Sequence, residues 1–278
     1  MAPPRALFTT IAFLTILGCD KRPVETTTAA SAVTPAATPP STANALPSGA
    51  ETAQTPTVAA KMADHFSSSV ALRDALVKGD LDAFHAAAAN LSDKELSANT
   101  SDAWKPHLEA MRIAAKRARD AKSVAVGAQA LADVGRACAA CHEKLGGPKL
   151  EVGAPPAPGS GAKPHMARHH WAAARLWDGL MAPSQEAWTK GAEVFTDAPL
   201  APEAIAAQSV PPEVNELAKR AHAYGQQAHA AKDATARAKA VAEVYATCVG
   251  CHTKLNVSVK WSRARSTFRP PRSPDSRA

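Results

Sequence analysis

An internal repeat constrains the fold of this chain more than any other feature of its sequence. The segment that begins at Met62 matches the segment that begins at Met166 without gaps, at an offset of 104 residues. The matched positions are apolar, acidic, aromatic and imidazole side chains: His65 and His169, Leu72 and Leu176, Asp74 and Asp178, Leu76 and Leu180, Phe84 and Trp188. A match across two helix lengths predicts two similar structural units in tandem.

A second repeated stretch lies further along each unit and carries a five-residue motif. Residues 138–145 match residues 248–255 at an offset of 110, and both copies begin with the pattern C-x-x-C-H. The change from 104 to 110 means that the second unit contains six extra residues, which the repeat places most simply in residues 198–212.

The pattern of apolar residues in both units predicts helices and no strands. Apolar positions recur at spacings of three and four, and glycine, proline or short polar clusters interrupt them. Asp80 and Ser184 precede the second helix of each unit and are suitable N-caps. We expect an all-α fold of two tandem four-helix bundles, with helices near 63–77, 81–91, 104–121, 123–144, 166–181, 185–195, 213–231 and 234–254.

The C-x-x-C-H motif is the signature of covalent haem attachment in c-type cytochromes. On a helix, positions i, i+3 and i+4 share a face, so two thiols can reach the two haem vinyl groups while the histidine binds the iron from below. This interpretation predicts two c-type haems, bound through the thiols Cys138, Cys141, Cys248 and Cys251 and the proximal iron ligands His142 and His252.

A C-x-x-C pair also occurs in redox dithiols and zinc sites. The haem interpretation is favoured because the motif occurs twice, each time at the end of the same repeat. With Cys19, the two motifs account for all five cysteines in the chain. A zinc site would prefer both pairs in one cluster, whereas the repeat assigns each pair to its own unit.

The order of the helices and the C-terminal position of the motif resemble the class II cytochromes, which comprise cytochrome c′ and its low-spin relatives. The resemblance covers residues 62–145 and 166–255, and implies a four-helix bundle with haem attached near the end of the last helix. Both units look shorter than a typical bundle of this class. We predict unit boundaries at 61–147 and 164–256, joined by a linker at 148–163.

In the low-spin relatives, a residue on the first helix is the sixth iron ligand. At matching positions on this helix the chain has His65 and His169, and three residues earlier Met62 and Met166. We expect the histidines to be the distal ligands, because imidazole binds iron strongly, and the methionines to be packing residues. The histidines that lack a counterpart are expected at the surface: His85, His107, His170, His222 and His229.

Iron with two axial ligands is suited to electron transfer, so we expect an electron carrier and not an enzyme. If the iron had five ligands, the vacant position would instead favour binding of nitric oxide or carbon monoxide, or reduction of peroxide. A structural module with incidental cysteines is a third class, but it requires the repeat and the motif to coincide by chance. The resemblance implies redox proteins as partners.

The N-terminal segment has the features of an export signal. Arg5 precedes a short apolar run, and residues 16–19 resemble a bacterial lipobox ending at Cys19. We expect residues 1–19 to be a signal peptide of the lipoprotein type and Cys19 to carry lipid, giving a periplasmic or membrane-anchored protein that faces the periplasm. An ordinary cleaved signal and an uncleaved apolar anchor are the alternatives.

Low-complexity segments flank the two units. Residues 20–60 are rich in threonine, alanine and proline, which predicts a disordered tether. Residues 257–278 contribute +5 of the formal net charge of +7 and predict a disordered basic tail. The body is close to neutral, so the sequence does not favour nucleic-acid binding. The tail is a candidate for steering an acidic redox partner.

Overall fold

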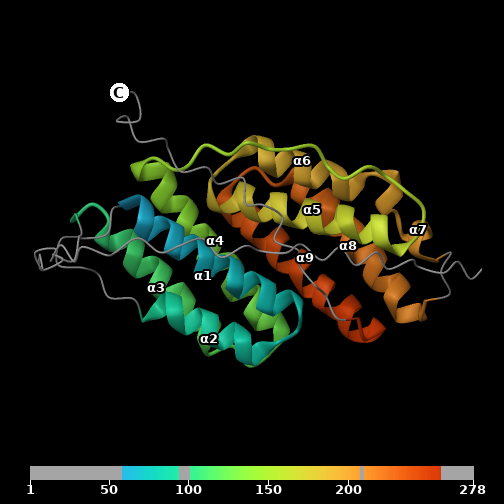
Figure 1. Ribbon diagram of the computed structural model, residues 1–278, viewed down its shortest axis with the longest axis horizontal. Helices are drawn as coiled ribbons and strands as arrows, with labels where there is room; N and C mark the ends of the chain where they lie inside the picture. Colours follow the sequence, from blue (N-terminus) through green and yellow to red (C-terminus); the bar gives the residue numbers. More distant parts are fainter. Residues whose placement is uncertain (1–57, 94–100, 207–209, 258–278) are drawn as a thin grey trace, which may run out of the picture. The chain divides into compact units, whose positions relative to one another are not determined.

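The computed structural model describes residues 58–93, 101–206 and 210–257, and these residues form helices, turns and loops without a strand. The all-α fold class is therefore confirmed for the described residues (Figure 1). Residues 1–57 and 258–278 lie outside them. The expected signal peptide, the lipidated Cys19, all but the last three residues of the tether, and nearly all of the basic tail fall in these segments.

The helices follow the predicted boundaries closely. They are α1 Val58–Val77, α2 Leu81–Ser92, α3 Lys105–Arg119, α4 Val124–Leu145, α5 Ala162–Met181, α6 Gln185–Thr196, α8 Pro212–Ala230 and α9 Ala234–Leu255. Both predicted N-caps are confirmed: the Asp80 carboxylate accepts a hydrogen bond from the Ala83 N–H, and the Ser184 hydroxyl accepts one from the Ala187 N–H.

The largest differences from the predicted boundaries occur at the starts of the units. Helix α1 begins inside the predicted tether and α5 begins inside the predicted linker. Alanines precede both predicted starts and favour the helical conformation. The six extra residues of the second unit contribute to a short 3₁₀ turn, Ala198–Leu200, and the one-turn helix α7, Pro202–Ala206.

Contacts between helices join the two repeats into one body. Within the first half (α1–α4) and the second half (α5–α9), each long helix packs against the next long helix. In addition, α4 packs along α9, and these are the two helices that carry C-x-x-C-H (Figure 1). Smaller contacts join α4 to α5 and α1 to α9.

The core between these helices is largely alanine with a few bulky side chains. The largest side chains without solvent exposure include Trp177, Phe84, Leu72, Leu131 and Tyr245. Glycine permits a close approach between α4 and α5. A Cβ atom on Gly135 of α4 would lie 2.9 Å from Leu180 Cδ2 and 3.0 Å from Trp177 Cζ3, both on α5.

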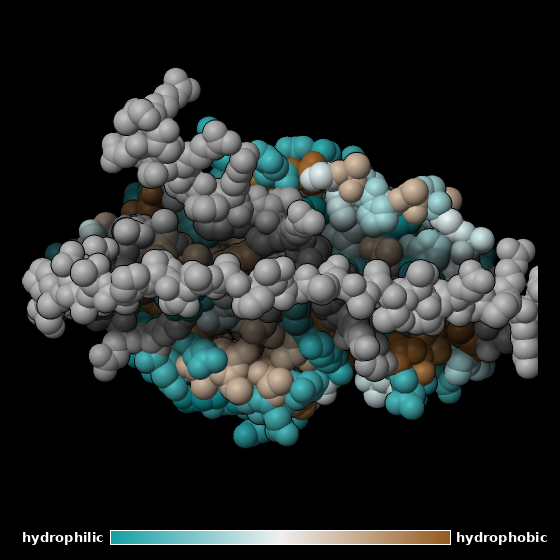
Figure 2. Space-filling view, in the orientation of Figure 1, coloured by the Kyte–Doolittle hydropathy of each residue, from teal (hydrophilic) through white to brown (hydrophobic). Residues whose placement is uncertain are grey.

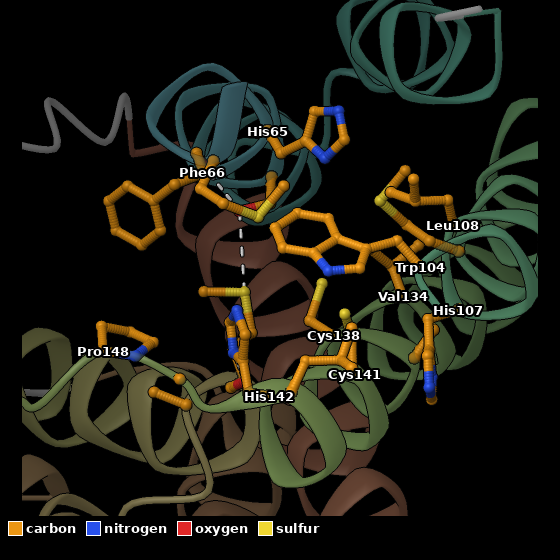
Figure 3. A pocket seen from close by; sticks show the side chains of 18 of the residues that line it. His65, Phe66, Trp104, His107, Leu108, Val134, Cys138, Cys141, His142 and Pro148 are labelled. Atoms are coloured by element: carbon orange, nitrogen blue, oxygen red, sulfur yellow. Dashed lines mark hydrogen bonds between the residues drawn. The ribbon is translucent and has the colours of Figure 1, made fainter. Parts of the chain in front are cut away.

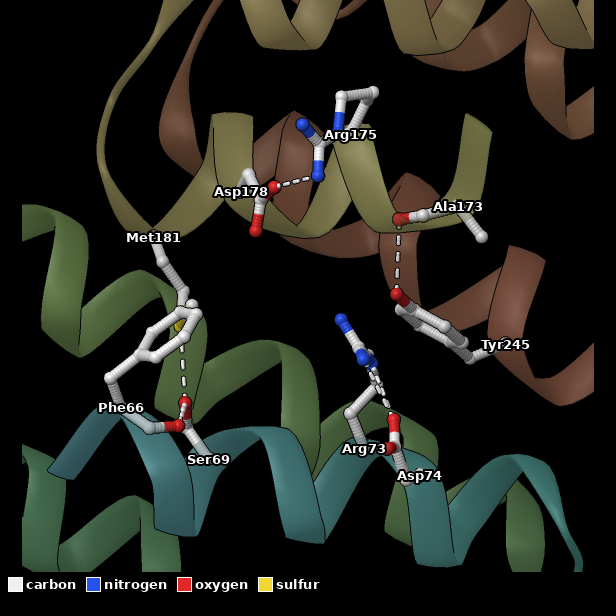
Figure 4. A network of polar contacts seen from close by, with 9 residues as sticks. All are labelled: Phe66, Ser69, Arg73, Asp74, Ala173, Arg175, Asp178, Met181 and Tyr245. Atoms are coloured by element: carbon white, nitrogen blue, oxygen red, sulfur yellow. Dashed lines mark hydrogen bonds and ion pairs between the residues drawn. The ribbon is translucent and has the colours of Figure 1, made fainter. Parts of the chain in front are cut away.

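Polar side chains also lie at the junction of the halves (Figure 4). The Tyr245 hydroxyl of α9 donates to the main-chain oxygen of Ala173 in α5 at 3.0 Å. Ion pairs form one turn apart in α5 and between neighbours in α1: Arg175 with Asp178 at 2.5 Å, and Arg73 with Asp74 at 2.7 Å. Both pairs are largely buried, so removal of a single charge is expected to be costly.

The surface of the described helices mixes hydrophilic and apolar areas on the face seen in Figure 2. Among the described helices, α4 has the length and apolar composition of a membrane-spanning helix. Half of its apolar window is buried within the body, and a core helix meets the same two criteria.

Candidate functional site

A cavity of about 490 Å³ lies between the first helix and the motif helix of the first half. Figure 3 shows the side chains around it, with His65 and Phe66 on α1 and Cys138, Cys141 and His142 on α4. Most of the lining is apolar, from residues that include Phe66, Leu91, Trp104, Leu108, Met111, Val134, Leu145, Pro148 and Leu150. We refer to this cavity as the first site.

The first site brings together every residue that the sequence assigns to it. The helical spacing of the motif directs both thiols and the imidazole to one side of the cavity, as its i, i+3, i+4 pattern predicts. His65 lines the cavity from α1, and so does Met62 one turn earlier. The motif, the repeat and the resemblance to class II cytochromes together located both sides of the site.

The orientation of His142 is set by a main-chain acceptor in the other half. Its Nδ1 lies 2.7 Å from the carbonyl oxygen of Met181, the last residue of α5. A carbonyl oxygen only accepts hydrogen bonds, so Nδ1 carries a proton, and in the neutral imidazole the lone pair is on Nε2. Histidines that bind metals usually have this arrangement, which fixes the tautomer and raises the basicity of the ligand.

The second motif repeats this contact in the opposite direction. His252 Nδ1 of α9 lies 3.3 Å from the carbonyl oxygen of Val77, the last residue of α1. Val77 and Met181 are equivalent at the offset of 104 residues. Each motif histidine is thus held by the first helix of the other half.

Buried imidazoles accompany the second motif, and we refer to this region as the second site. The Nε2 atom of His169 is buried without a hydrogen-bond partner, as are Nε2 of His165 and Nδ1 of His222. Burial lowers the pKa of His169 to about 3, with a smaller contribution from the neighbouring His165, His252 and His222. His169 is therefore a neutral imidazole at physiological pH, which is the form that binds iron.

The four described cysteines are free thiols. Burial raises the pKa of Cys138 to about 12, and that of Cys248 to about 12 for the same reason. Redox dithiols have a lowered cysteine pKa, because the thiolate is the reactive form. Among the residues that the structure describes, no cluster of three or more His, Cys, Asp or Glu side chains is arranged to hold a metal ion directly.

The residues present fit a covalently attached haem. The volume of the first site lies in the range of pockets that enclose a cofactor, roughly 300–1,000 Å³. Its apolar lining suits a macrocycle, its two thiols lie on one face for the vinyl groups, and His142 keeps an Nε2 lone pair for iron. In the second site, the buried Nε2 of His169 likewise needs a partner that the protein does not supply.

Sequence reasoning missed several residues of these sites. Trp104, Asp178 and Met181 line the first site, and the last two come from the other half. His107 was expected at the surface but also lines this cavity, and His85 is half-buried, with its Nε2 2.8 Å from the Ala121 main-chain oxygen.

Two further histidines differ from the surface positions expected for them, whereas one agrees. His222 has a buried Nδ1 atom, and burial lowers the pKa of His170 to about 4. His229 is exposed as expected. Met166 is 37% exposed, although its equivalent Met62 lines the first site. The exposure of these side chains depends on how distant helices pack against one another, which the local sequence does not reveal.

Comparisons with family models, with curated proteins and with solved structures found no match to this chain. The interpretation of both sites therefore depends on the residues themselves.

Proposed function

We propose that this protein is an exported c-type cytochrome that carries electrons between redox partner proteins through two covalently bound haems. Haem 1 is held by Cys138 and Cys141, and haem 2 by Cys248 and Cys251. The observation that carries the proposal is the first site, where two thiols and an oriented imidazole face a histidine of α1 across an apolar cavity.

The cysteines provide the covalent attachment. Each thiol adds across one vinyl group: a sulfur–carbon bond forms, and the thiol hydrogen is transferred to the adjacent vinyl carbon. This addition needs no oxidant. The resulting thioethers and the proximal histidines His142 and His252 keep the cofactor in place throughout the redox cycle.

When bound, each haem supplies an iron that gains or loses one electron. His65 and His169 close the distal sides of haem 1 and haem 2, so small molecules are excluded and the protein transfers electrons without acting as an enzyme. If either histidine leaves the iron open, the alternative function is binding of nitric oxide or carbon monoxide, or reduction of peroxide.

The proposed architecture is two tandem four-helix units in contact through their motif helices. Support comes from the packing of α4 along α9, which brings the two attachment helices together. Electrons can then pass between the haems through packed protein. Export, a lipid anchor at Cys19 and a position facing the periplasm complete the proposal. An N-terminal anchor of this kind would connect the body to a membrane.

The experiment that tests the proposal is maturation of the chain in a bacterial host that assembles c-type cytochromes. Mass spectrometry of the denatured protein should detect two covalent haems, and the optical spectrum should be low-spin and unchanged by carbon monoxide. The variants Cys138→Ala/Cys141→Ala and Cys248→Ala/Cys251→Ala should each retain one haem. A chain with no covalent haem would contradict the proposal, whereas a high-spin spectrum that responds to carbon monoxide would favour the alternative.

A further inference from the structure

The second half contains an imidazole for which the first half has no equivalent. His165 lies one helical turn before His169 on α5, and the position 104 residues earlier is Lys61. The His165 side chain is buried, with 4% exposure, and its ring centroid lies 4.5 Å from that of His169. Two imidazoles therefore lie side by side at the second site, whereas the first has only His65 at this position.

The tautomer of His165 is set by its surroundings. Its Nδ1 lies 2.7 Å from the carbonyl oxygen of Pro199, so Nδ1 carries the proton and Nε2 the lone pair. That Nε2 atom is buried and has no hydrogen-bond partner. Leaving a buried polar atom unsatisfied is destabilising, so its retention needs an explanation such as a bound partner.

The acceptor Pro199 belongs to the six-residue insertion region that distinguishes the second half. It lies in the short 3₁₀ turn Ala198–Leu200, which packs against α5. The first half lacks both the insertion and the extra imidazole. The insertion thus supplies the group that orients His165, which links the two sequence features that separate the halves.

The two motif histidines make the same kind of hydrogen bond as His165. His142, His252 and His165 each direct Nδ1 at a main-chain carbonyl oxygen and leave Nε2 available. We propose that His165 is a second iron-binding imidazole of haem 2, able to take the distal position in place of His169. This inference rests on the proposed function, and it makes the two haems unequal, because haem 1 has no reserve imidazole on its first helix.

The haem-loaded full chain tests this inference through its optical spectrum, its ferric electron paramagnetic resonance spectrum and its reaction with carbon monoxide. His169→Ala should remain low-spin with two nitrogen ligands and should not bind carbon monoxide at haem 2. His165→Ala alone should also remain low-spin. The double variant His165→Ala/His169→Ala should convert one of the two haems to a high-spin form that binds the gas.

The matched control is His65→Ala/His107→Ala, which removes the imidazoles other than that of the motif that line the first site. Half of the haem should then become high-spin or, if Met62 replaces the histidine, acquire the charge-transfer band of an iron–thioether bond. His169→Gln, which preserves side-chain size and polarity, repeats the test if His169→Ala fails to fold.

Two results would overturn the role of His165. The first is a high-spin haem 2 in the single His169 variants, which would mean that no reserve ligand exists. The second is a low-spin haem 2 in the double variant, which would assign the reserve role to another group such as His222. Failure of the proposed function is recognised separately, because it would already appear in the wild-type protein as missing covalent haem or as a gas-binding spectrum.

Discussion

The Nδ1 atom of His142 lies 2.7 Å from the main-chain oxygen of Met181, a residue that belongs to the other repeat. The equivalent contact joins His252 to Val77 at 3.3 Å. In both cases a carbonyl oxygen at the C-terminal end of a first helix accepts a hydrogen bond from the Nδ1–H of a motif histidine. The halves therefore exchange the groups that orient their motif histidines.

The exchange predicts that a change near the end of α1 acts on haem 2. Gly79 has a positive φ of 72°, and an added Cβ would lie 3.5 Å from Val249 Cγ1. Gly79→Ala is expected to cost about 1–2 kcal/mol of backbone strain and to displace the end of the helix. The weaker hydrogen bond to His252 lowers the basicity of the ligand, so the reduction potential of haem 2 should rise.

Redox titration measures this effect. The Cys138→Ala/Cys141→Ala variant lacks haem 1, so its single redox transition identifies the reduction potential of haem 2. Gly161→Ala is the matched control, because Gly161 also has a positive φ, 90°, but an added Cβ there meets no atom within 4 Å. It should lower stability without a change in either potential. A shift confined to haem 1 in Gly79→Ala would contradict the exchange.

The raised pKa values of the thiols predict an alkaline instability that haem removes. Burial raises the pKa of Cys138 and Cys248 from 9.0 to about 12. The folded state thus favours the protonated thiol, and this contribution to stability is complete below pH 9 and lost as the pH rises towards 12. In the haem-loaded chain these sulfurs are thioethers and do not titrate.

Denaturant unfolding of the haem-free chain between pH 8 and pH 11 checks this prediction. The free energy of unfolding should fall across this range, and it should fall less in the haem-free variant Cys138→Ala/Cys248→Ala. Tyr245, whose pKa is also raised by burial, contributes equally to both proteins. Identical pH dependence in the two proteins would show that the thiols are not buried.

The buried pair between Arg175 and Asp178 predicts a large effect of removing one charge. Their side chains are 6% and 10% exposed. Asp178→Asn removes the negative charge that balances the Arg175 guanidinium and should lower the free energy of unfolding by about 3 kcal/mol or more. Thermal or denaturant unfolding measures the loss.

An exposed pair on α6 provides the control for this measurement. Lys190 and Glu186 lie 2.8 Å apart, and their side chains are 42% and 58% exposed. Glu186→Gln should cost less than about 1 kcal/mol, because solvent screens the charges. Equal losses in the two variants would mean that Asp178 is not buried against Arg175.

Trp104 predicts a local effect on haem 1. Its indole lines the first site between the α1 and α4 side chains in Figure 3. Trp104→Ala should admit solvent, which stabilises the more highly charged oxidised iron, so the reduction potential of haem 1 should fall. Trp171→Ala, at a half-buried position outside the lining of the first site, should leave that potential unchanged. Electrochemistry of both variants distinguishes these outcomes.

The sequence predicted the elements of the first site because they follow local rules. Helical periodicity located α1 and α4, the motif spacing set Cys138 and Cys141 on one face, and the repeat paired His65 with His169. These features depend on neighbours within a few residues or on comparison of one half with the other.

The remaining features depend on contacts between distant helices, which no local pattern reveals. The acceptor atoms of Val77 and Met181 are main-chain oxygens, so their side chains carry no signal. Trp104 has Val214 as its equivalent, and His165 has Lys61, so the repeat comparison passed over both. The sequence signal that could have identified these two residues is that each differs in type from its equivalent in the other half.

The exchange of carbonyl acceptors restricts how the two repeats can diverge. Copies of a duplicated segment ordinarily accumulate substitutions independently once each folds around its own core. Here a substitution that bends the end of α1 would displace the carbonyl oxygen that accepts a hydrogen bond from a histidine 175 residues away in the sequence, in the other copy. Selection on each half therefore acts through the other, and neither half could be transferred into a new protein without losing the carbonyl oxygen that orients its motif histidine.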